Sequence, residues 1–178
     1  MFDVLSRMVR TGILTEKPAE APRTEQMHRS IYRILGRTLC IRQVDAGSCN
    51  GCELELHALN NPYYNLEGMG IRFVASPRHA DLLLVTGPVS VNMKEALRRT
   101  WDAIPDPKRV IAVGDCAACG GIFGKSYASR GSVAEILPVD LTIPGCPPAP
   151  AAVLEGILLV AGSGLGTRPP VDGQPSRI

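Results

Sequence analysis

Two short apolar runs, each ending in turn residues, constrain the fold of this chain more strongly than any other feature. Residues 82–85 (Leu-Leu-Leu-Val) lead into Thr-Gly-Pro, and residues 109–113 (Arg-Val-Ile-Ala-Val) lead into Gly114. Runs that lack the polar alternation of a half-exposed strand are typical of strands buried on both faces, as in parallel sheets. Parallel neighbours need crossover connections, usually helices, so the runs predict alternating strands and helices.

The same alternation of short apolar runs and helix-like patterns continues from about residue 39. It predicts an α/β fold with a parallel sheet and flanking helices. Strands are expected at residues 39–44, 71–75, 82–85, 109–113 and 141–143, and helices near residues 54–60, 93–104 and 149–161.

The 178 residues are enough for one domain with a substantial core. We expect that domain at residues 27–162, between a basic amphipathic arm with its linker at 1–26 and a flexible, Gly- and Pro-rich tail at 163–178. Within the arm, residues 1–14 have apolar side chains at helical spacing, and two prolines make residues 15–26 an extended linker. Two hypotheses stay open for residues 1–14: a helix on a membrane or partner, or a frayed helix packed on its own domain.

Charge is distributed unevenly along the chain. Residues 1–43 contain eight Lys or Arg and four Asp or Glu, whereas residues 44–178 contain eleven and thirteen. A basic N-terminal region indicates contact with an acidic surface, either anionic lipid or a partner subunit. Nucleic acid is not expected as a partner, because no basic stripe is interleaved with aromatic residues. No apolar run reaches 18 residues and no secretion signal is evident, so we expect a cytoplasmic protein.

Six cysteines in such a chain indicate metal or redox chemistry rather than disulfides. Cys49 and Cys52 follow the first predicted strand, and Cys116 and Cys146 each follow a later strand by three residues. In a parallel sheet the loops after the strands gather at one edge. Thiolates that meet there are the ligands that a [4Fe–4S] cluster needs. Small residues around the first cysteines would let backbone N–H groups face the cluster, and prolines stiffen the loop of Cys146.

A four-cysteine zinc site is the strongest alternative. The two CxxC pairs Cys49/Cys52 and Cys116/Cys119 have the right composition for it. However, the 63 residues between the pairs exceed what a zinc ribbon needs, and Cys146 would have no role. A thioredoxin-like redox pair is disfavoured by the additional cysteines.

Two further features carry less weight. Cys40 lies inside an apolar strand and is expected to be a plain buried residue. No GxGxxG or Walker A sequence supports a nucleotide site, although a flavin at the sheet edge stays compatible with the fold.

Three motifs in a fixed order give the sequence a family resemblance. They are residues 48–55 (Ser-Cys-Asn-Gly-Cys-Glu-Leu-Glu), 113–123 (Val-Gly-Asp-Cys-Ala-Ala-Cys-Gly-Gly-Ile-Phe) and 143–148 (Ile-Pro-Gly-Cys-Pro-Pro). Together they resemble the small subunit of energy-converting [NiFe] hydrogenases, a family that includes the B (20 kDa) subunit of respiratory complex I. The resemblance extends over about residues 38–160.

This resemblance implies a flavodoxin-like domain that carries one [4Fe–4S] cluster at the carboxyl edge of its sheet. The implied ligands are Cys49, Cys52, Cys116 and Cys146, with Cys119 outside the set. The implied partners are a NiFe-type large catalytic subunit, a ferredoxin-like iron–sulfur subunit and membrane-embedded subunits. In such an assembly this chain transfers electrons, and none of its residues is expected to be a catalytic acid or nucleophile.

Details of the motifs favour one branch of the family. Asn50 and Gly51 separate Cys49 from Cys52, as in hydrogenases, whereas complex I subunits usually have adjacent cysteines there. With no export signal or second cluster domain, the chain resembles the group 4 small subunits of formate hydrogenlyase and hydrogenase-4, peripheral on the cytoplasmic side of the inner membrane. A B-type subunit of a complex I-like quinone oxidoreductase is the alternative. Glu55 stands where the family often has Glu, and a structural role is favoured over proton handling.

Overall fold

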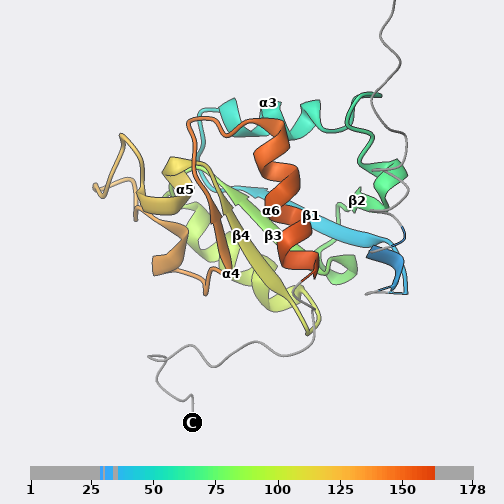
Figure 1. The fold of residues 1–178 in the computed structure, drawn as a ribbon. Coiled ribbons are helices and arrows are strands. Elements are labelled where there is room, and N and C mark those ends of the chain that lie inside the picture. The colour runs from blue at the N-terminus through green and yellow to red at the C-terminus, as the bar shows by residue number, and fades with distance from the viewer. Residues whose placement is uncertain (1–28, 30, 34–35, 163–178) are drawn as a thin grey trace, which may run out of the picture.

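A parallel sheet of five strands organises the part of the chain that the structure describes, which is residues 29, 31–33 and 36–162 of a computed structural model. The sheet order is β2-β1-β3-β4-β5, and each neighbouring pair is parallel (Figure 1). This is the strand order of flavodoxin-like folds, so the predicted α/β fold is confirmed. The strands are β1 (Leu39–Asp45), β2 (Ile71–Phe73), β3 (Leu82–Thr86), β4 (Arg109–Val113) and β5 (Leu141–Ile143).

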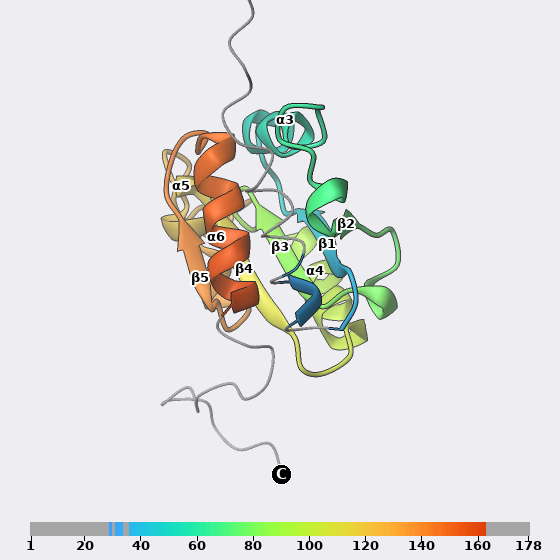
Figure 2. The same ribbon diagram turned by 45° about the vertical axis from the view of Figure 1, so that its right-hand side comes forward.

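Helices cover both faces of the sheet, and every residue of β3 and β4 is therefore buried. One face packs against α3 (Gly51–Ala58) and α6 (Pro150–Gly162). The other face packs against α4 (Met93–Ala103) and the short α5 (Asp115–Cys119). Figure 2 shows these layers from a second direction. The two apolar runs of the sequence are thus central strands, as predicted.

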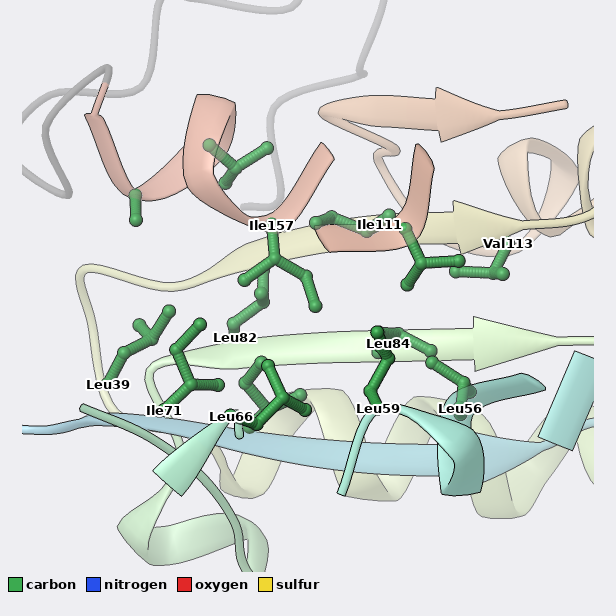
Figure 3. Close-up of a cluster of buried hydrophobic side chains, with 14 of the residues drawn as sticks. Leu39, Leu56, Leu59, Leu66, Ile71, Leu82, Leu84, Ile111, Val113 and Ile157 are labelled. Atoms are coloured by element: carbon green, nitrogen blue, oxygen red, sulfur yellow. The ribbon is translucent and has the colours of Figure 1, made fainter. Parts of the chain in front are cut away.

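The side chains of the central strands alternate between two separate cores. In β3, Leu82 and Leu84 belong to the cluster on the α3 and α6 side, whereas Leu83 and Val85 belong to the cluster on the α4 side. This alternation follows from the two-residue period of a strand. Figure 3 shows the first cluster, in which Ile157 of α6 projects toward the side chains of β3.

All five predicted strands and the three predicted helices are present, with small differences. β2 ends at Phe73 instead of residue 75, because this edge strand pairs with β1 over only three residues. α3 begins at Gly51 instead of near residue 54, since Asn50 adopts a left-handed conformation (φ 70°) that turns the chain directly into the helix. α5 was not predicted, because five residues are too few for a helical pattern.

The predicted arm and linker at 1–26 and the predicted tail at 163–178 lie outside the described residues. A short helical segment at 31–33 precedes β1 and places Ile31 in the core on the α3 and α6 side. Across the ranges that the structure describes, no helix has both the length and the apolar character needed to cross a membrane.

Two carboxylates tie strands together at the amino-terminal edge of the sheet. Asp140 accepts a hydrogen bond from Arg109 Nη1 at 2.9 Å and one from a backbone N–H of β4 at 2.7 Å. The side chains of Arg109 and Asp140 are only 9% and 13% exposed. Asp81 forms an ion pair with Arg37 and accepts the backbone N–H of Cys40 at 3.0 Å. This edge is therefore closed by charge pairs, and the cysteine loops lie at the opposite edge.

Replacing Asp140 by Ala should lower the free energy of unfolding by about 3–5 kcal/mol, because the buried Arg109 guanidinium would lose its carboxylate. Urea denaturation of the full chain measures the change. Glu95→Ala is the matched control, since Glu95 and Arg99 form an exposed pair within α4 that should contribute no more than about 0.5 kcal/mol. Equal losses in the two variants would contradict a buried role for Asp140.

Candidate functional site

Three loops that carry cysteines leave the same edge of the sheet. The loop after β1 carries Cys49 and leads into α3, which contains Cys52. Cys116 lies in α5, directly after β4, and Cys146 lies in the loop between β5 and α6. Because these strands are parallel, all three loops start at their carboxyl ends (Figure 1). The structure thus brings the predicted loops to the predicted edge.

The backbone of these loops lies close to the sulfur atoms. A Cβ atom added to Gly114 would lie 2.6 Å from Sγ of Cys52 and 3.3 Å from the carbonyl oxygen of Gly145. A Cβ atom added to Gly121 would lie 2.7 Å from Sγ of Cys116. At Gly114, therefore, the segments that follow β1, β4 and β5 come close to one another. Glycine is required there because any side chain would occupy the space of a thiol.

The thiols also influence one another electrostatically. Burial, followed by the neighbouring Glu53 carboxylate, raises the pKa of Cys52 from 9.0 to about 11, and the other site thiols Cys116, Cys49 and Cys146 add to the increase. Burial also raises the pKa of Cys116, followed by the smaller effects of Cys146, Cys49, Asp115 and Cys119. Cys49, Cys116 and Cys146 therefore all lie close enough to influence Cys52, and Cys119 influences Cys116 as well. A bound cation would reverse this effect, because it stabilises thiolates.

Hydrogen bonds hold the loop of Cys49 in place. Asp45, the last residue of β1, accepts the backbone N–H groups of Gly47 at 2.8 Å and Ser48 at 2.7 Å through Oδ1. Gly87 leaves room for this loop, since a Cβ atom there would lie within 2.5–2.7 Å of Ser48. Sequence reasoning missed Asp45 and Gly87. The available signal was an Asp before Gly and Ser at the end of a strand, which is typical of side-chain-capped turns.

The remaining two cysteines do not belong to this group in the same way. Cys119 is exposed at the end of α5, and its Sγ lies 3.3 Å from the carbonyl oxygen of Asp115. Cys40 lies near the start of β1, toward the opposite edge of the sheet. The prediction that Cys40 is a plain buried residue was wrong in degree, because it is half-buried.

Glu53 is a feature of the site that sequence reasoning missed. It follows Cys52 in the first turn of α3 and is 6% exposed. Neither carboxylate oxygen has a hydrogen-bond partner among the described residues. Glu55, which the sequence singled out, is only half-buried. The helical period places Glu53 on the same side of α3 as the core residue Leu56, a placement that depends on where the helix begins.

The donor set can be compared with what a single metal ion and a polynuclear cluster each require. Among the described residues, no group of three or more His, Cys, Asp or Glu side chains is arranged to hold one metal ion. A single zinc would need its four sulfurs at about 2.3 Å from one point, whereas a cluster of four irons offers each thiolate its own iron. Separate thiols with glycine backbone beside two of the sulfurs are compatible with the second arrangement.

In the metal-free folded chain, Cys52 should react with iodoacetamide about 100-fold more slowly at pH 8 than in the denatured chain, because its pKa is about 11 instead of 9.0. Mass spectrometry of the alkylated peptide measures both rates. The folded chain holds this proton more tightly than the unfolded chain. The stability it contributes is therefore complete below about pH 9 and is lost as the pH rises through about 11. Equal rates in the two states would contradict the burial of Cys52.

Gly121→Ala should lower the free energy of unfolding by at least about 1 kcal/mol more than Gly124→Ala. The two glycines have nearly the same positive φ, +54° and +55°, so both variants bear a similar left-handed strain. A Cβ atom at position 121 would lie 2.7 Å from Sγ of Cys116, whereas position 124 has no atom within 4 Å. Denaturant titration of the two variants isolates the clash with Cys116. Equal losses would show that the sulfur does not occupy this space.

The chain resembles known proteins over most of its length. The family described as NADH ubiquinone oxidoreductase, 20 Kd subunit, matches residues 49–160. A probable membrane-bound hydrogenase subunit, mbhJ, from Pyrococcus furiosus is 40% identical over 160 residues, which are 88% of this chain and 96% of that protein. Formate hydrogenlyase subunit 7 from Escherichia coli is 43% identical over 85% of this chain and 62% of its own length. A B-type NADH-quinone oxidoreductase subunit from Chloroflexus aurantiacus is 46% identical over 61% of this chain and 63% of that protein.

Solved structures agree with these relatives. A chain of the membrane-bound sulfane sulfur reductase, an archaeal respiratory membrane complex, superposes with a TM-score of 0.63 at 33% identity and covers 78% of this chain and 77% of its own. A chain of an NAD+-reducing [NiFe]-hydrogenase has the same fold, with a TM-score of 0.57 at 20% identity over 75% of this chain and 96% of its own. The family match and the long alignment to the Pyrococcus protein lead to one assignment: the chain belongs to the family of the 20 kDa subunit of NADH ubiquinone oxidoreductase, a family of oxidoreductase subunits.

Proposed function

We propose that this chain is the electron-transfer subunit of a membrane-bound, hydrogen-evolving [NiFe] hydrogenase complex. It would hold one [4Fe–4S] cluster on Cys49, Cys52, Cys116 and Cys146, next to the NiFe centre of a large catalytic subunit. The observation that carries the proposal is the meeting of three cysteine loops at one sheet edge, where a Cβ atom on Gly114 would be close to both Sγ of Cys52 and the carbonyl oxygen of Gly145. When bound, the cluster supplies one-electron transfer.

The residues of this chain would position the cluster and shield it. Cys52 and Cys116 are partly buried, whereas Cys49 and Cys146 are exposed. A cluster held this way has one side against the sheet edge and one side toward a partner. Burial and hydrogen bonds from the loops then set its reduction potential. No residue of the chain needs to act as a catalytic acid or nucleophile.

Exposed apolar side chains near the cysteines support a partner at this edge. Tyr127 and Ile122 are 99% and 89% exposed, and Phe123 and Leu54 also expose more than half of their surface. Leu54 lies in α3 two residues after Cys52, and Ile122 and Phe123 come shortly after the end of α5, past Gly120 and Gly121. Large apolar side chains exposed beside a candidate site are typical of an interaction surface. We assign this surface to the large subunit, since electrons must pass between the two over a short distance.

The branch of the family is inferred from the relatives and from the first motif. Two relatives with long alignments carry hydrogenase names, a probable membrane-bound hydrogenase subunit and a formate hydrogenlyase subunit. Asn50 and Gly51 between Cys49 and Cys52 agree with that branch. The second candidate is a B-type subunit of a complex I-like quinone oxidoreductase, which the Chloroflexus relative favours. The similarity to a sulfane sulfur reductase chain adds a reason to test for nickel directly.

The remaining parts of the assembly follow from the same proposal. A ferredoxin-like iron–sulfur subunit would deliver electrons, and membrane-embedded subunits would anchor the complex. The chain itself would be peripheral, on the cytoplasmic side of the inner membrane. The eight Lys and Arg among residues 1–43 would favour contact with anionic lipid or with the membrane subunits.

Cys146→Ser should lose most of the iron, whereas Cys119→Ser should retain about four irons and four sulfides per chain. Both variants are coexpressed with the large subunit, purified without oxygen, and analysed for metal, sulfide and EPR signal after reduction. Cys119→Ser is the matched control because it removes an exposed thiol from the same group of loops. Zinc without sulfide, lost in Cys119→Ser and kept in Cys146→Ser, would replace the proposal with a zinc-stabilised interaction module.

Nickel in the copurified large subunit separates the two branches. Its presence supports the hydrogenase assignment. Iron and sulfide in this chain without nickel in the partner would instead assign the chain to a quinone oxidoreductase or another reductase of the family.

A further inference from the structure

Two hydrogen bonds join the loops of Cys116 and Cys146, which lie 30 residues apart in the sequence. The backbone N–H of Asp115 donates to the carbonyl oxygen of Gly145 at 2.9 Å. In return, Oδ1 of Asp115 accepts the backbone N–H of Gly145 at 2.8 Å. Each residue directly precedes a cysteine of the site. The two cysteines are thus linked through a reciprocal pair of bonds between their immediate neighbours.

The loop of Cys146 has few other ways to be held. Within residues 144–148, three positions are proline and have no N–H, so only Gly145 and Cys146 can donate from the backbone. Gly145 adopts a φ of +135°, and a Cβ atom there would lie 2.6 Å from Cα of Pro148. Its N–H points at the Asp115 carboxylate, which provides a charge-assisted bond, roughly twice as strong as a neutral one.

A second aspartate at this edge of the sheet has a different pattern of bonds. Asp45 accepts N–H groups only from its own loop, at Gly47 and Ser48. Asp115 instead bonds across to the loop after β5, through both its backbone N–H and its carboxylate. Its carboxylate is therefore placed to hold two cysteine loops together.

We propose that Asp115 is a positioning residue whose carboxylate fixes the Cys146 loop against the Cys116 loop, so that the two thiols form a preset pair of ligands. The inference rests on the proposed function, in which both cysteines bind the same cluster. It adds that this half of the site is assembled before metal arrives. The pair Cys49 and Cys52, held by β1 and α3, then completes it.

The test compares Asp115→Asn, Asp115→Ala and the control Asp102→Ala in the full chain. The amide oxygen of Asn can still accept the N–H of Gly145, whereas Ala cannot. Asp102 is exposed near the end of α4, away from the cysteine loops. The first readout, on metal-free protein, is hydrogen exchange of the Gly145 amide by NMR. It should be fastest in Asp115→Ala, much closer to wild type in Asp115→Asn, and unchanged in Asp102→Ala.

The second readout is the rate at which a chelator removes iron from the anaerobic complex, together with the EPR spectrum of the reduced cluster. Asp115→Ala should lose iron about tenfold faster and show a shifted spectrum, as expected for the loss of one bond to a charged group. Asp115→Asn keeps the acceptor without the charge and should restore most of both properties.

Two results would overturn the inference. The first is an Asp115→Ala variant that matches Asp102→Ala in both readouts. The second is an Asp115→Asn variant that behaves as badly as Asp115→Ala, because the effect would then come from charge and not from the acceptor. A wild-type chain that holds no iron would refute the proposed function instead, while the exchange of Gly145 would still decide the role of Asp115.

Discussion

The parallel pairing of the strands is the constraint on which the candidate site depends. β1, β4 and β5 run in one direction, so the residues that follow them emerge at one edge even though almost 100 positions separate Cys49 from Cys146. β3 lies between β1 and β4 and carries no cysteine, but the chain just past its end leaves room for the loop of Cys49. Gly87, just past its end, lets the backbone of Ser48 approach to a distance that any side chain would prevent. The sheet therefore determines where the loops meet, and glycine determines how closely.

Close packing of the site makes the thiolate form of its cysteines unfavourable. Burial and neighbouring groups hold the pKa of Cys52 and of Cys116 above the ordinary value, so the site without metal favours neutral thiols. The free-energy cost therefore arises only when these thiols ionise. A bound metal ion would reverse the preference, because it stabilises thiolates directly, and its binding would release the thiol protons.

The sequence predicts the strands well because each buried strand needs an unbroken apolar run, and such runs are visible without any knowledge of partners. It also predicts the edge at which the cysteine loops leave the sheet, because the cysteines come shortly after these runs. It does not predict α5, whose five residues have no period, nor the burial of Glu53, which depends on where α3 begins. The bond from Gly145 to Asp115 was also out of reach, because it joins residues 30 positions apart that only the β4 and β5 pairing brings together.

The two ends of the sheet differ in a way that separates stability from function. At the amino-terminal edge, Asp81 and Asp140 each have a guanidinium partner and a backbone donor. At the carboxyl edge, Glu53 is buried with no hydrogen-bond partner among the described residues, and large apolar side chains nearby are exposed. Burying an unpaired carboxylate costs free energy, as does exposing apolar surface. An edge with both features has polar and apolar groups that the described part of the chain does not satisfy or cover. Its completion by a cofactor and a partner subunit would satisfy groups that the chain alone leaves unsatisfied.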